Sequence, residues 1–256
     1  MEYTKREYKY LIIAIIVLTL VFGFNDGKET FELSYWLANL VKVFIIVAFS
    51  VFVHDFAHDL MAKKYGFLSE FRLLGIKGFY KKNPFPKTFN LFGKELKIRS
   101  FPIGIVIALL ITLASNGLIF FTAISCYGLV ILKHYRFGKK FIEVTDFEEA
   151  KVAVAGPLSN ILIALIFSAF NVNSLFDTVV MVNAWMAFWD ILPLPGLDGA
   201  KVYIGSRPLF VFSFVLIIGL VILVRLAHVS SFLSLILAFA MSITLLISYL
   251  FSKARQ

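Results

Sequence analysis

The sequence predicts an all-α polytopic membrane protein, with about six core transmembrane helices and a short membrane hairpin. Hydrophobic residues make up 60% of its 256 positions, whereas soluble domains contain about 45–50%. Several apolar runs approach the roughly 20 residues that a helix needs to cross the bilayer. The 29 phenylalanines suit contact with lipid and argue against a water-filled porin.

The apolar runs are the candidate spans. They cover residues 10–24, 32–62, 101–132, 150–170, 178–194, 208–227 and 231–252. The first run follows Lys5, Arg6 and Lys9 and is itself followed by the polar stretch 25–28, without a small-residue cleavage site. We therefore expect a retained first helix and no signal peptide.

The run 101–132 is too long for one simple pass. Its middle carries Ser115-Asn116-Gly117, which is a turn signal. The sequence therefore predicts two short passes or a re-entrant hairpin. Irregular backbone at that depth needs cover from protein or a water-filled cavity.

The longest polar insert, residues 66–100, is expected to be a basic cytoplasmic loop within a single domain that covers residues 1–256. Residues 83–86, Asn-Pro-Phe-Pro, break any helix there. Residues 91–98 are compatible with a short hairpin, and residues 141–145 with a strand that pairs with it.

The positive charges set the orientation. With the N-terminus in the cytoplasm, all but three of the 25 Lys and Arg residues fall on the cytoplasmic side; the exceptions are Lys28, Lys42 and Arg225. This asymmetry predicts that both termini are cytoplasmic. The net charge of +9 therefore suits anionic lipid at the bilayer surface and indicates no nucleic-acid partner.

The second apolar run ends in two histidines four residues apart, His54 and His58. On a helix these positions share one face, so both imidazoles can reach one metal ion, and zinc is the usual occupant. Asp198, in the Pro- and Gly-rich segment after residue 192, is the strongest candidate for a third ligand. Two simpler interpretations stay open, namely histidines that only hydrogen-bond a neighbour and an Asp198 that only caps a turn.

The chain resembles the site-2 protease family of intramembrane zinc metalloproteases, through three motifs in order over about residues 45–205. The family pattern H-E-x-x-H reads H-D-F-A-H at residues 54–58. The pattern A-G-P-x-x-N reads A-G-P-L-S-N at residues 155–160, where it is expected to open a helix. The pattern N-x-x-P-x-P-x-L-D-G reads D-I-L-P-L-P-G-L-D-G at residues 190–199.

The resemblance implies one zinc ion between helices, and a role for each matching residue. The metal ligands would be His54, His58 and Asp198. The catalytic positions would be Asp55, for the general base, and Asp190, for an Asn that holds substrate or the oxyanion. The residues that shape the helix beside the metal would be Gly156, Pro157 and Asn160.

Two of these residues depart from the family pattern. Asp55 is one methylene shorter than Glu, and a general base must lie within about 2.6–3.2 Å of its proton or act through a water. An ionised Asp190 cannot donate a hydrogen bond to an oxyanion. Asp59 is expected to point away from the metal, where it either supports a ligand from behind or forms a surface salt bridge near Lys63. The single Cys126 is expected to pack in its apolar run.

The leading hypothesis is a zinc metallo-endopeptidase that cuts a peptide bond in or near a transmembrane helix of a protein substrate, on the cytoplasmic side of the bilayer. The alternative, motivated by Asp55 and Asp190, is a catalytically impaired pseudo-protease that binds metal and membrane proteins. A metal or proton transporter is the third hypothesis, and the sequence shows neither the internal repeats nor the polar path that favour it. The oligomeric state does not follow from the sequence.

Overall fold

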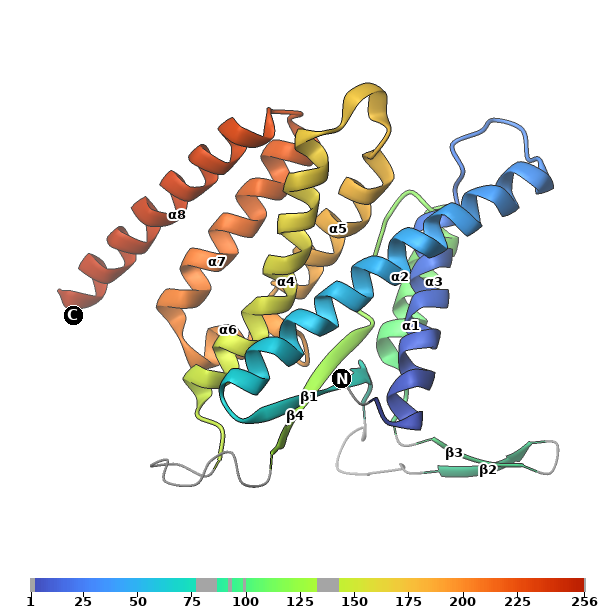
Figure 1. Ribbon diagram of the computed structural model, residues 1–256, viewed down its shortest axis with the longest axis horizontal. Helices are drawn as coiled ribbons and strands as arrows, with labels where there is room; N and C mark the ends of the chain where they lie inside the picture. Colours follow the sequence, from blue (N-terminus) through green and yellow to red (C-terminus); the bar gives the residue numbers. More distant parts are fainter. Residues whose placement is uncertain (1–2, 77–86, 92–93, 99, 133–142, 256) are drawn as a thin grey trace.

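The computed structural model describes residues 3–76, 87–91, 94–98, 100–132 and 143–255. Helices form most of it, with two small two-stranded sheets below them in the view of Figure 1. The helices are α1 (Lys5–Gly23), α2 (Leu33–Lys64), α3 (Ile103–Ala114), α4 (Asp146–Ala169), α5 (Asp177–Asp190), α6 (Asp198–Gly205), α7 (Arg207–Leu220) and α8 (Ser231–Ala254). A 3-10 turn, η1 (Val172–Ser174), precedes α5, and α7 continues into a π-helical segment, η2 (Val221–Leu226).

Within the described residues, four helices are long and apolar enough to cross a membrane: α2, α4, α7 with η2, and α8. The helix α1 has 19 residues, but four of its first five are charged, and α5 has only 14 residues, so both fall short of the roughly 20 apolar residues of a full span. The chain is thus a multi-span helical protein, as predicted. The expected total of about six spans stays a prediction.

The longest helix, α2, connects the two halves of the molecule. It packs against α1 on one side and against α4 on the other, with α5 and the first strand also in contact. One apolar core lies between α1, α2, α3 and part of α5, and a second lies between α4, α5, α7 and α8. The second core contains fully or almost fully buried alanines, among them Ala164, Ala184, Ala187 and Ala238. Such small residues let helix backbones approach closely in a membrane.

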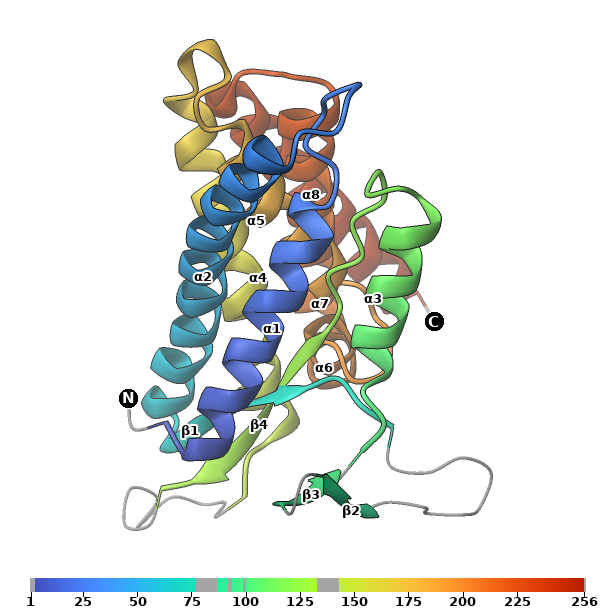
Figure 2. The same cartoon turned by 90° about the vertical axis from the view of Figure 1, so that its right-hand side faces the viewer.

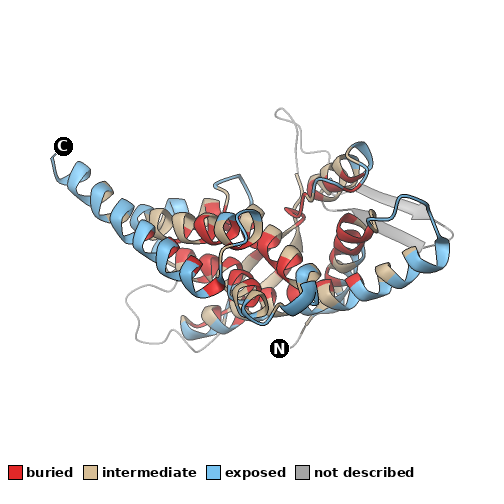
Figure 3. Cartoon of the chain, turned by 90° about the horizontal axis from the view of Figure 1, so that it is seen from above, coloured by how far each residue is buried: buried red, intermediate tan, exposed pale blue. Residues whose placement is uncertain are grey.

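The outer surface of α8 is apolar and exposed. Figure 3 shows exposed residues along almost its whole length, and Phe232 is 77% exposed. Exposure of such an apolar surface to water is unfavourable, whereas lipid chains would cover it. The position of α8 at one edge of the molecule therefore fits a membrane setting.

A two-stranded antiparallel sheet lies under the ends of α1 and α2, and its presence corrects the expectation of an all-α fold (Figure 2). Strand β1 (Phe67–Leu73) pairs with β4 (Ser125–Ile131), with Phe71 opposite Tyr127. The helical pattern of the apolar run did not reveal β4, because a short apolar run is compatible with either element.

The long run 101–132 does turn back on itself, as predicted. Helix α3 ends at Ala114, and Asn116 and Gly117 adopt positive φ angles of 50° and 72° in the turn that follows. The chain then returns as extended backbone that leads into β4, and no second helix forms over residues 115–132.

The expected hairpin in the basic insert is present, but it starts earlier than predicted. Strand β2 (Lys87–Leu91) pairs with β3 (Lys94–Ile98). The predicted partner strand at residues 141–145 lies partly outside the described residues, and its described part, residues 143–145, forms no strand.

Candidate metal centre

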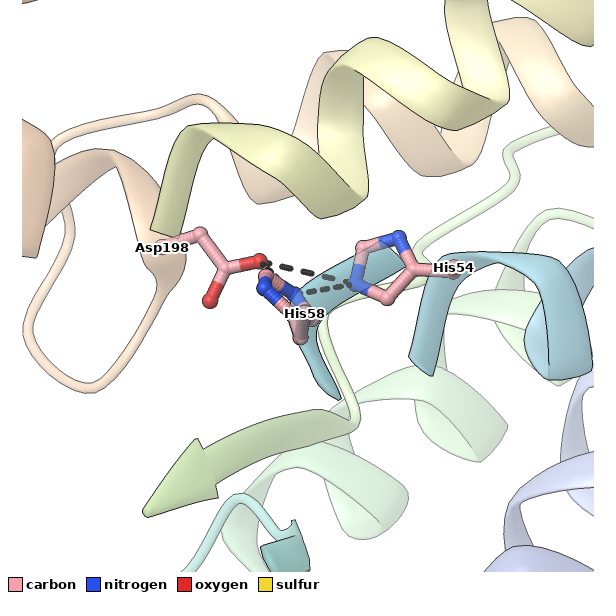
Figure 4. A group of neighbouring side chains, drawn as sticks. All are labelled: His54, His58 and Asp198. Atoms are coloured by element: carbon pink, nitrogen blue, oxygen red, sulfur yellow. Dashed lines mark hydrogen bonds and ion pairs between the residues drawn. The ribbon is translucent and has the colours of Figure 1, made fainter. Parts of the chain in front are cut away.

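Helix α2 brings His54 and His58 to one buried point. Their side chains are 8% and 3% exposed, and their Nε2 atoms lie 3.0 Å apart. The i,i+4 spacing stacks the two imidazoles on one face of the helix, as the sequence predicted. Figure 4 shows both rings with Nε2 turned toward the same space.

Asp198 approaches this point from a different part of the chain. It is the first residue of α6, and its Oδ2 lies 3.0 Å from Nε2 of His58 and 3.5 Å from Nε2 of His54. A close turn places it there, since a Cβ on Gly199 would lie 2.0 Å from the carbonyl oxygen of Ile191. Gly196 has a φ of 91°, which other residues rarely adopt.

The three side chains fit a zinc ion by distance. Two ligand atoms at about 2.05 Å from zinc, separated by the tetrahedral angle, lie about 3.3 Å apart. The observed separations among His54, His58 and Asp198 are 3.0, 3.0 and 3.5 Å. All three residues are buried, and their ligand atoms lie within 4.8 Å of one another.

The position of the ring proton of His58 also favours a cation at this point. Nδ1 of His58 lies 2.8 Å from the carbonyl oxygen of Val152, which can only accept, so Nδ1 carries the proton and donates it. In neutral His58 the lone pair of Nε2 then faces a second imidazole nitrogen and a carboxylate oxygen. One extra proton among Nε2 of His58, Nε2 of His54 and Oδ2 of Asp198 would form one hydrogen bond, whereas a metal ion can bind all three atoms.

The charge state of Asp198 suits metal binding as well. Burial by itself raises the pKa of this carboxyl, but its interactions with His58 and His54 outweigh burial and hold the pKa below its usual range. The carboxylate is therefore ionised, which is the form that binds a metal.

Gly156 lets both histidine rings come close to helix α4. It belongs to α4, and a Cβ at this position would lie 2.3 Å from Nε2 of His58 and 2.6 Å from Nε2 of His54. Any larger residue would collide with both rings. The two rings can therefore pack this closely against α4 only because residue 156 is a glycine.

The motif at residues 155–160 does not open a helix as expected. Helix α4 begins at Asp146, capped by Thr145 and Glu148, so Pro157 lies inside the helix and does not open it. One turn on, Asn160 is fully buried, and its Nδ2 has no hydrogen-bond partner within the described residues.

Asp55 borders the same site. It is 3% exposed, and its Oδ2 accepts a hydrogen bond of 2.8 Å from the hydroxyl of Tyr3. It helps to line a cavity of about 10 Å³ together with His54, His58, Phe71, Ser125, Cys126, Tyr127 and Asp198. A cavity of this size holds about one water.

Asp190 lies on the opposite side of the His54 ring from the ligand atoms. Its Oδ2 is 3.8 Å from Nδ1 of His54, and both side chains are buried. Nδ1 of His54 has no hydrogen-bond partner in the part of the chain that the structure describes. Metal-binding histidines usually present this second nitrogen to a carboxylate or a carbonyl, so the geometry suits Asp190 to orienting His54.

Strand β4 contributes residues that the sequence did not reveal. The ring of Tyr127 stacks on His58 with centroids 4.4 Å apart, and Lys201 of α6 donates a 2.7 Å hydrogen bond to the carbonyl oxygen of Tyr127. Cys126, expected only to pack, lines the small cavity. No local motif marks these residues, because the pairing of β1 with β4 is what brings them to the site.

Three other side chains lie outside the centre. Asp59 pairs with Lys63 at 2.8 Å, as expected. Trp189 donates a 2.6 Å hydrogen bond to the carbonyl oxygen of Phe120 and packs in the first core. His228 is exposed near the start of α8.

One curated relative was found. A protein of Methanocaldococcus jannaschii named "Putative zinc metalloprotease MJ0611" is 24% identical to this chain over 209 residues, which cover 78% of this chain and 85% of that protein. No protein-family model matches the chain, and no solved structure does. The relative's name agrees with the resemblance to zinc metalloproteases and supports zinc as the metal.

Proposed function

We propose that this chain is an intramembrane zinc metalloprotease that hydrolyses a peptide bond in or near a transmembrane helix of another protein. The observation that carries the proposal is the buried convergence of His54, His58 and Asp198, packed closely beside Gly156. A zinc ion there would polarise the scissile carbonyl and lower the pKa of a water. The relative named as a zinc metalloprotease supports the same chemistry.

The chain's own residues have distinct tasks in this proposal. Asp55 would take the proton of the attacking water and pass it to the leaving amine. With Oδ2 of Asp55 held by Tyr3, the task falls to Oδ1. Asp190, on the Nδ1 side of His54, would orient that imidazole and would not contact the oxyanion.

The membrane part of the proposal rests on the helices and the charges. The site lies near the end of α2, before Lys63 and Lys64, and the distribution of Lys and Arg favours a cytoplasmic location for that end. We propose cytoplasmic termini and about six spans, with α1 and α5 completing the four long helices. Water would then reach the small cavity from the cytoplasm.

The β1–β4 sheet supports a peptide substrate. Strand β4 lines the cavity through Ser125, Cys126 and Tyr127, and in the described residues it pairs only with β1. A strand with one unpaired edge can bind an extended peptide through backbone hydrogen bonds. Such pairing would favour the unwinding that exposes a helical peptide bond to attack.

The test is cleavage of a reporter transmembrane peptide by the purified protein in detergent, together with its zinc content. We expect about one zinc per chain, cleavage that a chelator abolishes, and loss of both in His58→Ala. His228→Ala is the matched control, because this exposed histidine lies outside the site. A wild-type protein that holds no zinc would refute the proposal.

The pseudo-protease is the second candidate, and one observation favours it. Asp55 is short, and one of its oxygens is already hydrogen-bonded to Tyr3. Stoichiometric zinc without cleavage, followed by cleavage in Asp55→Glu, would decide for this candidate and against the protease.

A further inference from the structure

Tyr3, in the segment before α1, is the residue that contacts the carboxylate of Asp55. Its hydroxyl donates to Oδ2 of Asp55 at 2.8 Å, across 52 positions of sequence. We infer that Tyr3 is a positioning residue, which holds the Asp55 carboxylate beside the metal centre. This inference rests on the proposed function, because it assigns Tyr3 to the same reaction.

The segment around Tyr3 is anchored by several polar contacts. The next residue, Thr4, caps α1 in a reciprocal pair with Glu7, with a 2.7 Å hydrogen bond from the Thr4 backbone to the Glu7 carboxylate. The other oxygen of Glu7 accepts from the backbone N–H of Phe71 on β1 at 3.3 Å, and Glu7 is 5% exposed. The start of α1 is thus tied to the sheet that lines the site, so the position of Tyr3 is fixed relative to Asp55.

Asp55 lies between two cavities, which gives its carboxylate two places to point. One is the small cavity beside the metal ligands. The other has a volume of about 250 Å³, and its lining includes Tyr3, Glu7, Asp55, Asp59 and Ser69. A hydrogen bond from a fixed hydroxyl to one carboxylate oxygen restricts this rotation, and such bonds to an ionised group are roughly twice as strong as neutral ones.

The hydroxyl of Tyr3 is well suited to act as a donor. Burial and the neighbouring Asp55 carboxylate raise the pKa of Tyr3 above its usual range. The phenol therefore keeps its proton. A phenylalanine at this position would keep the ring and its edge contact with Tyr8 but would lose the hydrogen bond to Asp55.

The kinetic test compares Tyr3→Phe in two backgrounds. In the wild type we expect kcat to fall about tenfold, the equivalent of about 1.4 kcal/mol, with KM unchanged. In Asp55→Glu the longer side chain places its carboxylate elsewhere, so we expect Tyr3→Phe to change kcat by less than about twofold. Tyr8→Phe is the matched control, because Tyr8 is 55% exposed and lies outside the site. An equal fall in both backgrounds would mean a general structural role and would overturn the inference.

A second test needs no proteolysis. Tyr3→Phe should lower Tm by roughly 3–6 °C in the wild type and by less than about 1 °C in Asp55→Ala, because the acceptor is then gone. Equal shifts in the two backgrounds would overturn the inference whatever the activity. Coupled shifts in a protein that cleaves nothing would support the Tyr3–Asp55 contact and refute the proposed protease instead.

Discussion

Replacement of Gly156 by alanine tests whether the space beside the two histidines is a metal site. The added Cβ would lie 2.3 Å from Nε2 of His58 and 2.6 Å from Nε2 of His54, whereas ordinary contact begins at 3.4 Å. At least one imidazole would have to move by about 1 Å, and zinc sites tolerate only about 0.2 Å of change in ligand distance. We expect zinc affinity to fall by at least about 100-fold, comparable to the largest losses seen when an outer partner of a metal ligand is removed.

The Gly156→Ala substitution should not destabilise helix α4 itself. Alanine is favoured over glycine in a helix interior by about 1 kcal/mol, so the expected loss of zinc is not a consequence of unfolding α4. Zinc affinity would be measured by competition with a chromophoric chelator, with Tm recorded on the apo-protein. Gly219→Ala is the matched control, because its Cβ would lie 3.3 Å from the Cβ of Ala238, which needs to shift by only a few tenths of an ångström. Wild-type zinc affinity in Gly156→Ala would refute the assignment of this space to a metal.

Two further predictions concern the same centre. Asp190→Ala should lower zinc affinity by about 10–100-fold, because His54 would lose the carboxylate near its Nδ1. The control is Asp177→Ala, which removes an acid at the other end of the same helix and should leave zinc affinity unchanged. Equal losses in the two variants would argue against an orienting role for Asp190. Removal of zinc by a chelator should lower Tm, and zinc at 100 times its Kd should restore about 2.7 kcal/mol of stability. A Tm that does not respond to zinc in the wild type, or that responds equally in His58→Ala, would contradict a site formed by the folded chain.

The sequence by itself determined the helical membrane character of this protein and the residues that meet at its centre. The membrane character and the residues of the centre both follow from short-range patterns in the sequence. Apolar runs near the length of a bilayer predict helices, and an i,i+4 spacing predicts that His54 and His58 share a face. The motif match then pointed to Asp198 and Gly156, which the structure places within contact distance of both rings.

Only the tertiary structure decided how the residues that surround and hold the metal ligands are arranged. The pairing of β1 with β4, the position of Asp190 behind His54 and the hydrogen bond from Tyr3 to Asp55 all join residues that lie far apart in the chain. Such contacts leave no periodic signal, since neither partner's local sequence depends on the other's position. Local patterns therefore identify the ligands of the candidate metal centre, whereas the packing of distant segments decides how Asp55 and His54 are held.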